Sequence, residues 1–333
     1  MVELSNEPGT RADVQALRAQ AMLFTRPAAE IFSMLVTEAQ LIEPYDTTRA
    51  ATLFTRAASI GVTAADLAGA HQVAQLAARM AEPGINWSAT MALAVVRANL
   101  GEVDAALALL KPLLQTSQWV PTLDEIMVLS GVAQSLAWME QWSSARQVLD
   151  HIVGAARMAA APAALIFPLA ALAEFELRLG KVSAAYAAAA ESVQLAAETG
   201  HASLSSFALV VLARVEAVLG HPDDSRAHIA SALEFSRLVG SHSIEHYAAS
   251  TLGLLELSSG HPDRAVRHLI DCERLERQLM AVYSARSGRP SRGRMLATIT
   301  QWAADLVEAL IRSGATTDAK RSLAVLEETC RRP

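Results

Sequence analysis

The sequence of 333 residues has few aromatic side chains, few cysteines and no long unbroken apolar run. Aromatic residues make up only 5% of the chain, whereas 52% of it is hydrophobic. This composition can bury a large core, and its abundance of alanine and leucine favours long helices packed through small residues over a β-sandwich. We therefore expect an all-α protein.

Cysteine and positive charge are also scarce. Cys272 and Cys330 lack CxxC spacing, which argues against a zinc site or a disulfide scaffold and fits a reducing, cytoplasmic compartment. The net charge of −6 provides no broad basic field for binding phosphates. We therefore expect no direct DNA binding from this chain alone.

Membrane segments and targeting signals are missing as well. The longest apolar run, residues 159–173, contains two prolines and is too short to span a bilayer. The N-terminus has no apolar stretch preceded by basic residues, so it does not read as a signal peptide. We expect no membrane association, and a flexible N-terminus over residues 1–10.

What the sequence does contain is a phased series of turns. The motif GHPD occurs at 220–223 and again at 260–263, and helical apolar spacing flanks each copy. Similar turns lie 39 or 40 residues apart, anchored on Gly61, Gly101, Gln141, Gly180, Gly220 and Gly260. A small residue stands five positions after most anchors: Ala106, Ala185, Ser225 and Ala265. The pattern predicts repeated helical hairpins of about 40 residues.

The letters of the GHPD turn have a physical explanation. Glycine permits the left-handed conformation that ends a helix, and proline two residues later suits the first turn of the next helix. The aspartate then lies at the positive end of the helix dipole. A lone hairpin cannot bury its apolar face, so stacking into a superhelix with a concave groove is expected. We predict one helical-repeat domain over residues 11–333.

One interval breaks the period. Gly260 and Gly314 are 54 residues apart, and the surplus falls at 284–295. This stretch contains four arginines, Arg286, Arg289, Arg292 and Arg294. It predicts a basic loop with two open interpretations, a solvated insertion or a contact with phosphate or an acidic partner. No aromatic residues interleave with the arginines, as a platform for single-stranded nucleic acid would require.

The catalytic motifs are few. HSIEH, His242 to His246, matches the H-x-x-E-H form of inverted zinc metallopeptidases, but the sequence indicates no third ligand. The polar start of a helix is the favoured interpretation, with a zinc hydrolase as a remote alternative. Phosphate-binding loops, nucleophile elbows and dinucleotide fingerprints are absent from the sequence. We therefore expect no enzyme, no cofactor and no metal.

The stretches NLGEVDAA and RLGKVSAA resemble the inter-helix turn of tetratricopeptide repeats, although the helices here are longer. On that phasing, matching positions upstream of the anchors face the concave groove. They are Asn99, Trp138, Phe167, Glu174, Arg178, Phe207, Arg214 and Tyr247. Aromatics with a few charges suit a peptide or a small molecule. Two other interpretations remain open: the aromatics belong to the core, and Glu174 pairs with Arg214 between neighbouring helices.

Residues 37–60, 247–269 and 301–328 resemble the helical-repeat region of large ATP-binding bacterial transcription regulators of the LuxR type, the group that includes the maltose regulator. In that family a nucleotide-binding module precedes the repeats and a DNA-reading helix-turn-helix follows them. This sequence has no phosphate loop before residue 40, and it stops at ETCRRP. The resemblance therefore implies the sensor role of the repeats, without ATP hydrolysis or DNA binding.

The prediction is a non-enzymatic module of such a regulator, with a small effector or a protein partner in its groove. The alternative is a free-standing scaffold for protein interactions. Association into a homo-oligomer is open, because the end faces of stacked repeats need polar caps to stay apart.

Overall fold

The computed structural model describes residues 7–22, 26–80, 87–115, 121–200, 202–239, 241–288 and 301–331. Within these ranges the chain forms sixteen α-helices and no strand, which confirms the all-α class. In chain order the helices are α1 (Pro8–Met22), α2 (Ala28–Ile42), α3 (Thr47–Thr63), α4 (Leu67–Met80), α5 (Trp87–Asn99), α6 (Val103–Leu114), α7 (Leu123–Trp138), α8 (Trp142–Met158), α9 (Pro162–Arg178), α10 (Val182–Thr199), α11 (Ala202–Leu219), α12 (Pro222–Val239), α13 (His242–Ser258), α14 (Pro262–Ser287), α15 (Trp302–Arg312) and α16 (Thr316–Arg331).

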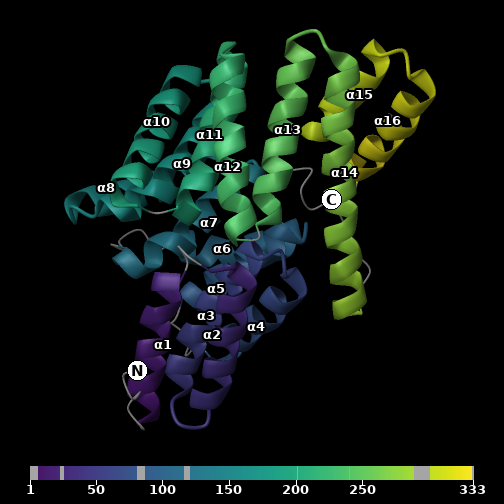
Figure 1. Cartoon of the computed structure of the whole chain (residues 1–333). Coiled ribbons are helices and arrows are strands. Elements are labelled where there is room, and N and C mark those ends of the chain that lie inside the picture. The colour runs from purple at the N-terminus through teal and green to yellow at the C-terminus, as the bar shows by residue number, and fades with distance from the viewer. Residues whose placement is uncertain are drawn as a thin grey trace.

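The helices pack as hairpins that stack side by side into a superhelix (Figure 1). Each hairpin pairs an odd-numbered helix with the next even one, as α9 with α10 and α11 with α12. The odd-numbered helices also contact one another in series, α7 with α9, α9 with α11 and α11 with α13. This is the tetratricopeptide-like helical-repeat superhelix that the 40-residue period predicts. No described helix is long and apolar enough to cross a membrane.

The GHPD turns have the expected chemistry. Gly220 has a φ of 80°, and the backbone N–H of His221 donates to the carbonyl of Glu216 at 2.9 Å. This bond satisfies a carbonyl at the end of α11 that has no intrahelical partner, as in a Schellman motif. Pro222 then begins α12, and the turn at 260–263 repeats this geometry.

At two of the predicted anchors, Gly61 and Gln141, a different residue has the left-handed turn conformation. Gly61 is inside α3, and the turn comes four residues later at Ala65, which has a φ of 57°. A Cβ added at Gly61 would lie 2.9 Å from the Cβ of Ala70, so the glycine allows α3 and α4 to approach closely. In the turn between α7 and α8 the left-handed residue is Glu140, with a φ of 58°, and the predicted anchor Gln141 follows it as the N-cap of α8.

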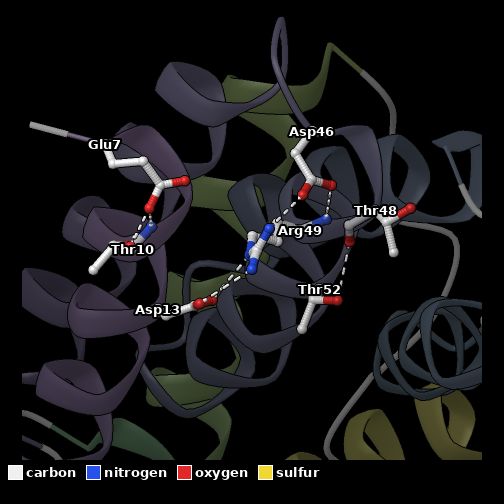
Figure 2. Close-up of polar contacts among 7 residues, drawn as sticks. All are labelled: Glu7, Thr10, Asp13, Asp46, Thr48, Arg49 and Thr52. Atoms are coloured by element: carbon white, nitrogen blue, oxygen red, sulfur yellow. Dashed lines mark hydrogen bonds and ion pairs between the residues drawn. The ribbon is translucent and has the colours of Figure 1, made fainter.

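The last three positions of the segment predicted to be flexible, residues 1–10, form the first turn of α1. Figure 2 shows the contacts at this helix start. The Glu7 carboxylate accepts a hydrogen bond from the Thr10 backbone N–H at 3.1 Å, which satisfies a free donor of the first turn. One turn later, Asp13 pairs with Arg49 of α3 at 3.1 Å. The first six residues lie outside the described part of the chain.

The predicted basic loop at 284–295 is helical over its first four residues, because α14 runs for 26 residues to Ser287. Figure 1 shows α14 extending well past α13 toward α4. Near its end, Tyr283 is 5% exposed, and Arg286 forms an ion pair with Asp66 at 2.6 Å. Part of the sequence surplus is therefore helix that joins the last repeats to the first ones. The remainder of the predicted loop lies outside the described residues.

The contacts between helices of a hairpin depend on small residues. The four residues that stand five positions after the anchors are all fully buried, namely Ala106, Ala185, Ser225 and Ala265. The Ser225 hydroxyl donates to the carbonyl of Ala213 at 2.8 Å, which ties α12 to α11. Small side chains at these points let the two helices approach closely and pack densely.

Buried glutamates reinforce the stacking at the turns. Three of them stand four residues before a turn glycine in successive repeats and are at most 7% exposed: Glu176, Glu216 and Glu256. Each pairs with a basic side chain of an adjacent helix, in the same order Arg146, His228 and Arg226. A buried carboxylate needs such a partner, so these pairs help to set which helices lie side by side.

Candidate functional site

A cavity of about 550 Å³ lies among the inner helices of the superhelix, and we call it the lumen. Its wall includes residues of α3, α5, α7, α9, α11 and α13, together with residues of α2, α4 and the extended α14. Helices from both ends of the chain therefore surround one space. The volume is within the range of pockets that hold small molecules.

Five of the eight predicted groove residues lie in the wall of the lumen. They are Asn99, Trp138, Phe167, Phe207 and Tyr247. Of the other three, Glu174 and Arg178 form a polar cluster connected to this wall, and Arg214 lies near enough for the charges of both to affect its pKa. The structure thus places all eight residues in one region, and their contact with a ligand stays a prediction.

Three of these wall residues form an aromatic ladder. Phe167, Phe207 and Tyr247 stand 40 residues apart on α9, α11 and α13. The ring centroids of Phe167 and Phe207 are 5.4 Å apart with an interplanar angle of 87°, and those of Phe207 and Tyr247 are 5.8 Å apart at 85°. Edge-to-face pairs of this kind each contribute about 0.5 to 1.5 kcal/mol beyond the area they bury. The repeat itself therefore builds a continuous apolar strip along the wall.

Glu174 is the centre of the polar cluster. Its carboxylate, on a residue that is 6% exposed, accepts hydrogen bonds from the Gln134 amide and the Trp138 indole, both at 2.9 Å. Arg178, one helical turn later, pairs with the same carboxylate at 3.3 Å. Burial and the neighbouring Glu174 raise the pKa of Tyr247 well above its usual range. The tyrosine is therefore a neutral wall residue at ordinary pH.

Arg214 differs from the sequence interpretation that pairs it with Glu174. The described residues contain no such ion pair, and Glu174 pairs with Arg178 instead. The Arg214 guanidinium instead donates to the Ser250 hydroxyl at 3.1 Å. Burial lowers the pKa of Arg214, and the nearby Asp305 counteracts this effect. The two predicted charges therefore have separate partners on different helices.

The HSIEH motif does not form a metal site. His242 is exposed and bonds Glu245 of its own helix at 3.2 Å, whereas His246 is fully buried against the Trp302 ring, with centroids 6.3 Å apart. Burial, with a smaller effect of the Arg214 charge, lowers the pKa of His246 to about 4. The two imidazoles thus lie at different depths. The described part of the chain holds no cluster of three or more histidine, cysteine or acidic residues suited to a metal ion.

The four predicted loop arginines have different outcomes. Arg286 is on α14 and pairs with Asp66, at a crevice of about 320 Å³ that Phe32 also lines. Its charge therefore serves a contact within the chain. Arg289, Arg292 and Arg294 lie outside the described residues.

Sequence reasoning missed the wall residues that are not at the predicted groove phase. Val95 and Gly131 come from α5 and α7, and Leu279 comes from the extension of α14. The apolar residues that continue at helical spacing through Leu279 and Tyr283 were a signal that the helix extends, although nothing in the period shows where it docks.

No protein-family model matches this sequence, and comparison with curated proteins finds no match. Among solved structures, the chain is similar to a signal-transduction ATPase with numerous domains from Pyrococcus horikoshii that has a tetratricopeptide-repeat sensor. That match has a TM-score of 0.50 and 14% identity, covering 91% of this chain and 54% of the other. A tetratricopeptide-repeat protein from Parabacteroides merdae has a TM-score of 0.46 and 13% identity, covering 83% of this chain and 98% of the other. The chain thus spans about half the length of the Pyrococcus protein, and the likeness concerns the fold alone.

Proposed function

We propose that this chain is a non-enzymatic binding module whose lumen receives a small effector or a segment of a partner protein. The observation that carries the proposal is the lumen itself, about 550 Å³ of space bordered by an aromatic ladder and by helices from both ends of the chain. Close-packed protein interiors leave few voids larger than a water molecule, and the volume of the lumen is within the range of pockets that hold small molecules.

The proposed setting is a transcription regulator of the LuxR type, with the module as its sensor. Two features support this setting. Residues 37–60, 247–269 and 301–328 resemble the repeat region of such regulators. The Pyrococcus protein of similar fold is itself described as having a tetratricopeptide-repeat sensor. ATP hydrolysis and DNA reading are not part of the proposed role of this chain.

The test is a thermal-shift screen of the purified chain against a metabolite library, run in parallel on Gly131→Leu. Gly131 lies in the wall, and a Cβ added there has ordinary contacts with Val95, at 3.5 and 3.6 Å. A Cβ at this position meets no backbone atom of another helix within 4 Å, and the longer side chain of leucine is expected to take up part of the lumen. Gly154→Leu on α8 is the matched control, because a Cβ at Gly154 meets no atom within 4 Å.

A ligand at a hundred times its dissociation constant stabilises the folded state by about 2.7 kcal/mol. We expect at least one compound to raise the melting temperature of the wild type and of Gly154→Leu, but not that of Gly131→Leu. Compounds that shift all three proteins equally, or a library without effect, would contradict a small-effector role for the lumen.

A further inference from the structure

The lumen wall carries almost no charge. Among its described residues Arg26 alone is charged, and its side chain is 59% exposed and pairs with Glu30 at 3.9 Å. Most of this side chain is therefore in contact with solvent. The interior of the lumen is therefore lined by uncharged side chains.

Several polar groups of the wall already have partners within the protein. The Asn99 amide donates to the carbonyl of Val95 at 2.9 Å, and the hydroxyls of Ser241 and Ser243 bond each other at 3.0 Å. The Trp138 indole N–H is used by Glu174. Among the buried polar atoms of the described wall, the hydroxyls of Ser135 and Tyr247 are the ones without a hydrogen-bond partner. A ligand in the lumen therefore meets two isolated hydroxyls and no charged group that needs it as a partner.

The charges behind the wall are also engaged. Glu174 accepts hydrogen bonds from Gln134 and Trp138 and pairs with Arg178, and the Arg214 guanidinium bonds Ser250. Arg214 forms no ion pair among the described residues, but it is not one of the residues that line the lumen. A charged ligand group would therefore leave water without meeting an opposite charge in the wall itself. Such a transfer is strongly unfavourable.

The aromatic ladder shows what the wall does offer. Phe167, Phe207 and Tyr247 stand edge to face along three successive helices, and Gly131 and Val95 add apolar surface from α7 and α5. Aromatic and aliphatic rings pack well against such a surface. We infer that the ligand of the lumen is an uncharged, largely apolar small molecule, and this inference rests on the proposed function of the lumen as a binding site.

Two fluorescent probes that share one skeleton test the inference. N-phenyl-1-naphthylamine is neutral, whereas 8-anilino-1-naphthalenesulfonate carries an added sulfonate, and both brighten in apolar surroundings. Each probe is titrated into the full chain as wild type, Gly131→Ala, Gly131→Leu and Gly154→Leu. Circular dichroism of every variant confirms the helical fold before titration, and Gly131→Ala provides a graded change that requires no displacement of neighbours.

We expect the neutral probe to bind the wild type at least about tenfold more tightly than the sulfonate, because the sulfonate must be desolvated without a partner. Binding of the neutral probe should weaken in Gly131→Ala, be lost in Gly131→Leu and be unchanged in Gly154→Leu. If the sulfonate binds as tightly and is also lost in Gly131→Leu, the lumen is a binding site but the inferred ligand class is wrong. If no probe responds to Gly131→Leu, both the ligand class and the proposed function are overturned.

Discussion

Two glycines in the middle of helices show how differently the two regions of this molecule are packed. Gly253 of α13 lies in the seam between the two helices of a hairpin, where an added Cβ would lie 2.4 Å from Cδ2 of Leu269. Gly131 of α7 lies in the lumen wall, where the nearest atom to an added Cβ is 3.5 Å away on Val95. The seam has no room for one methyl group, whereas the lumen has room for a whole side chain.

Charged side chains are also distributed differently around the hairpin contacts and around the lumen. Near the turns, buried glutamates are paired with basic side chains of an adjacent helix, Glu216 with His228 within a hairpin and Glu256 with Arg226 between neighbouring hairpins. The lumen interior is uncharged over its described residues. The seams thus specify which helices pack together, and the wall is free to differ without disturbing the stack.

The largest effect is expected from filling the seam. Gly253→Ala should lower the free energy of unfolding by about 2 kcal/mol, because the new methyl group displaces Leu269 from a dense contact. Urea denaturation measures this change. In the double variant with Leu269→Ala the cost of the two substitutions should be less than the sum of the single costs. Simple additivity would show that the steric explanation is wrong.

A similar loss is expected from the buried His246 as the pH falls. Burial lowers its pKa to about 4, compared with 6.5 for an ordinary imidazole, so between these values the unfolded chain binds a proton that the folded chain does not. Protonation of this imidazole in the unfolded chain should lower the free energy of unfolding by about 2 kcal/mol as the pH falls from roughly 7.5 to 5. His246→Phe should remove this part of the pH dependence in urea denaturation. His242→Gln, one turn earlier and exposed, should retain it, and equal pH profiles for all three proteins would contradict the assignment.

A smaller loss is expected when a buried glutamate loses the nearest of its basic partners. Arg226→Ala removes the 2.8 Å pair with buried Glu256 and should cost about 1 to 2 kcal/mol, whereas Arg321→Ala, in an exposed pair of α16, should cost almost nothing. Burial acts to raise the pKa of Glu256, but the Arg226 hydrogen bond and neighbouring positive charges outweigh it and lower the pKa below 4.5. The stabilisation is therefore present above pH 4.5 and is lost as the pH falls through the lowered pKa. Denaturation at two pH values measures the difference between the variants, and an equal cost for both would contradict the pairing.

The smallest effect has the opposite sign. Gly131→Ala in the lumen wall should stabilise the protein by about 0.5 to 1 kcal/mol, because alanine is a better helix former and its methyl group has space. Gly154→Ala, on the exposed face of α8, should give a similar gain. Thermal denaturation of both variants next to Gly253→Ala provides the comparison. A loss of stability in Gly131→Ala would show that the wall is as tightly packed as the seam.

Much of the fold and part of the candidate site followed from local sequence signals. Gly220 and its neighbours describe a helix end and a helix start, and the structure confirms that geometry. The 40-residue period also places Phe167, Phe207 and Tyr247 at one phase, and they form a ladder. Gly61 misled the interpretation, because glycine serves close helix approach as readily as turns.

The sequence by itself determined the helix–turn–helix unit, its period and the small residues at each seam, since these depend on interactions between near neighbours along the chain. Only the tertiary structure decided that α14 reaches α4, that Arg286 meets Asp66, and that Glu174 bonds Trp138 and not Arg214. Contacts between the first and last repeats depend on the small rotation that each repeat adds to the stack. The rotations of all repeats together set the curvature of the superhelix and therefore the shape of the lumen. No short stretch of sequence encodes this total rotation.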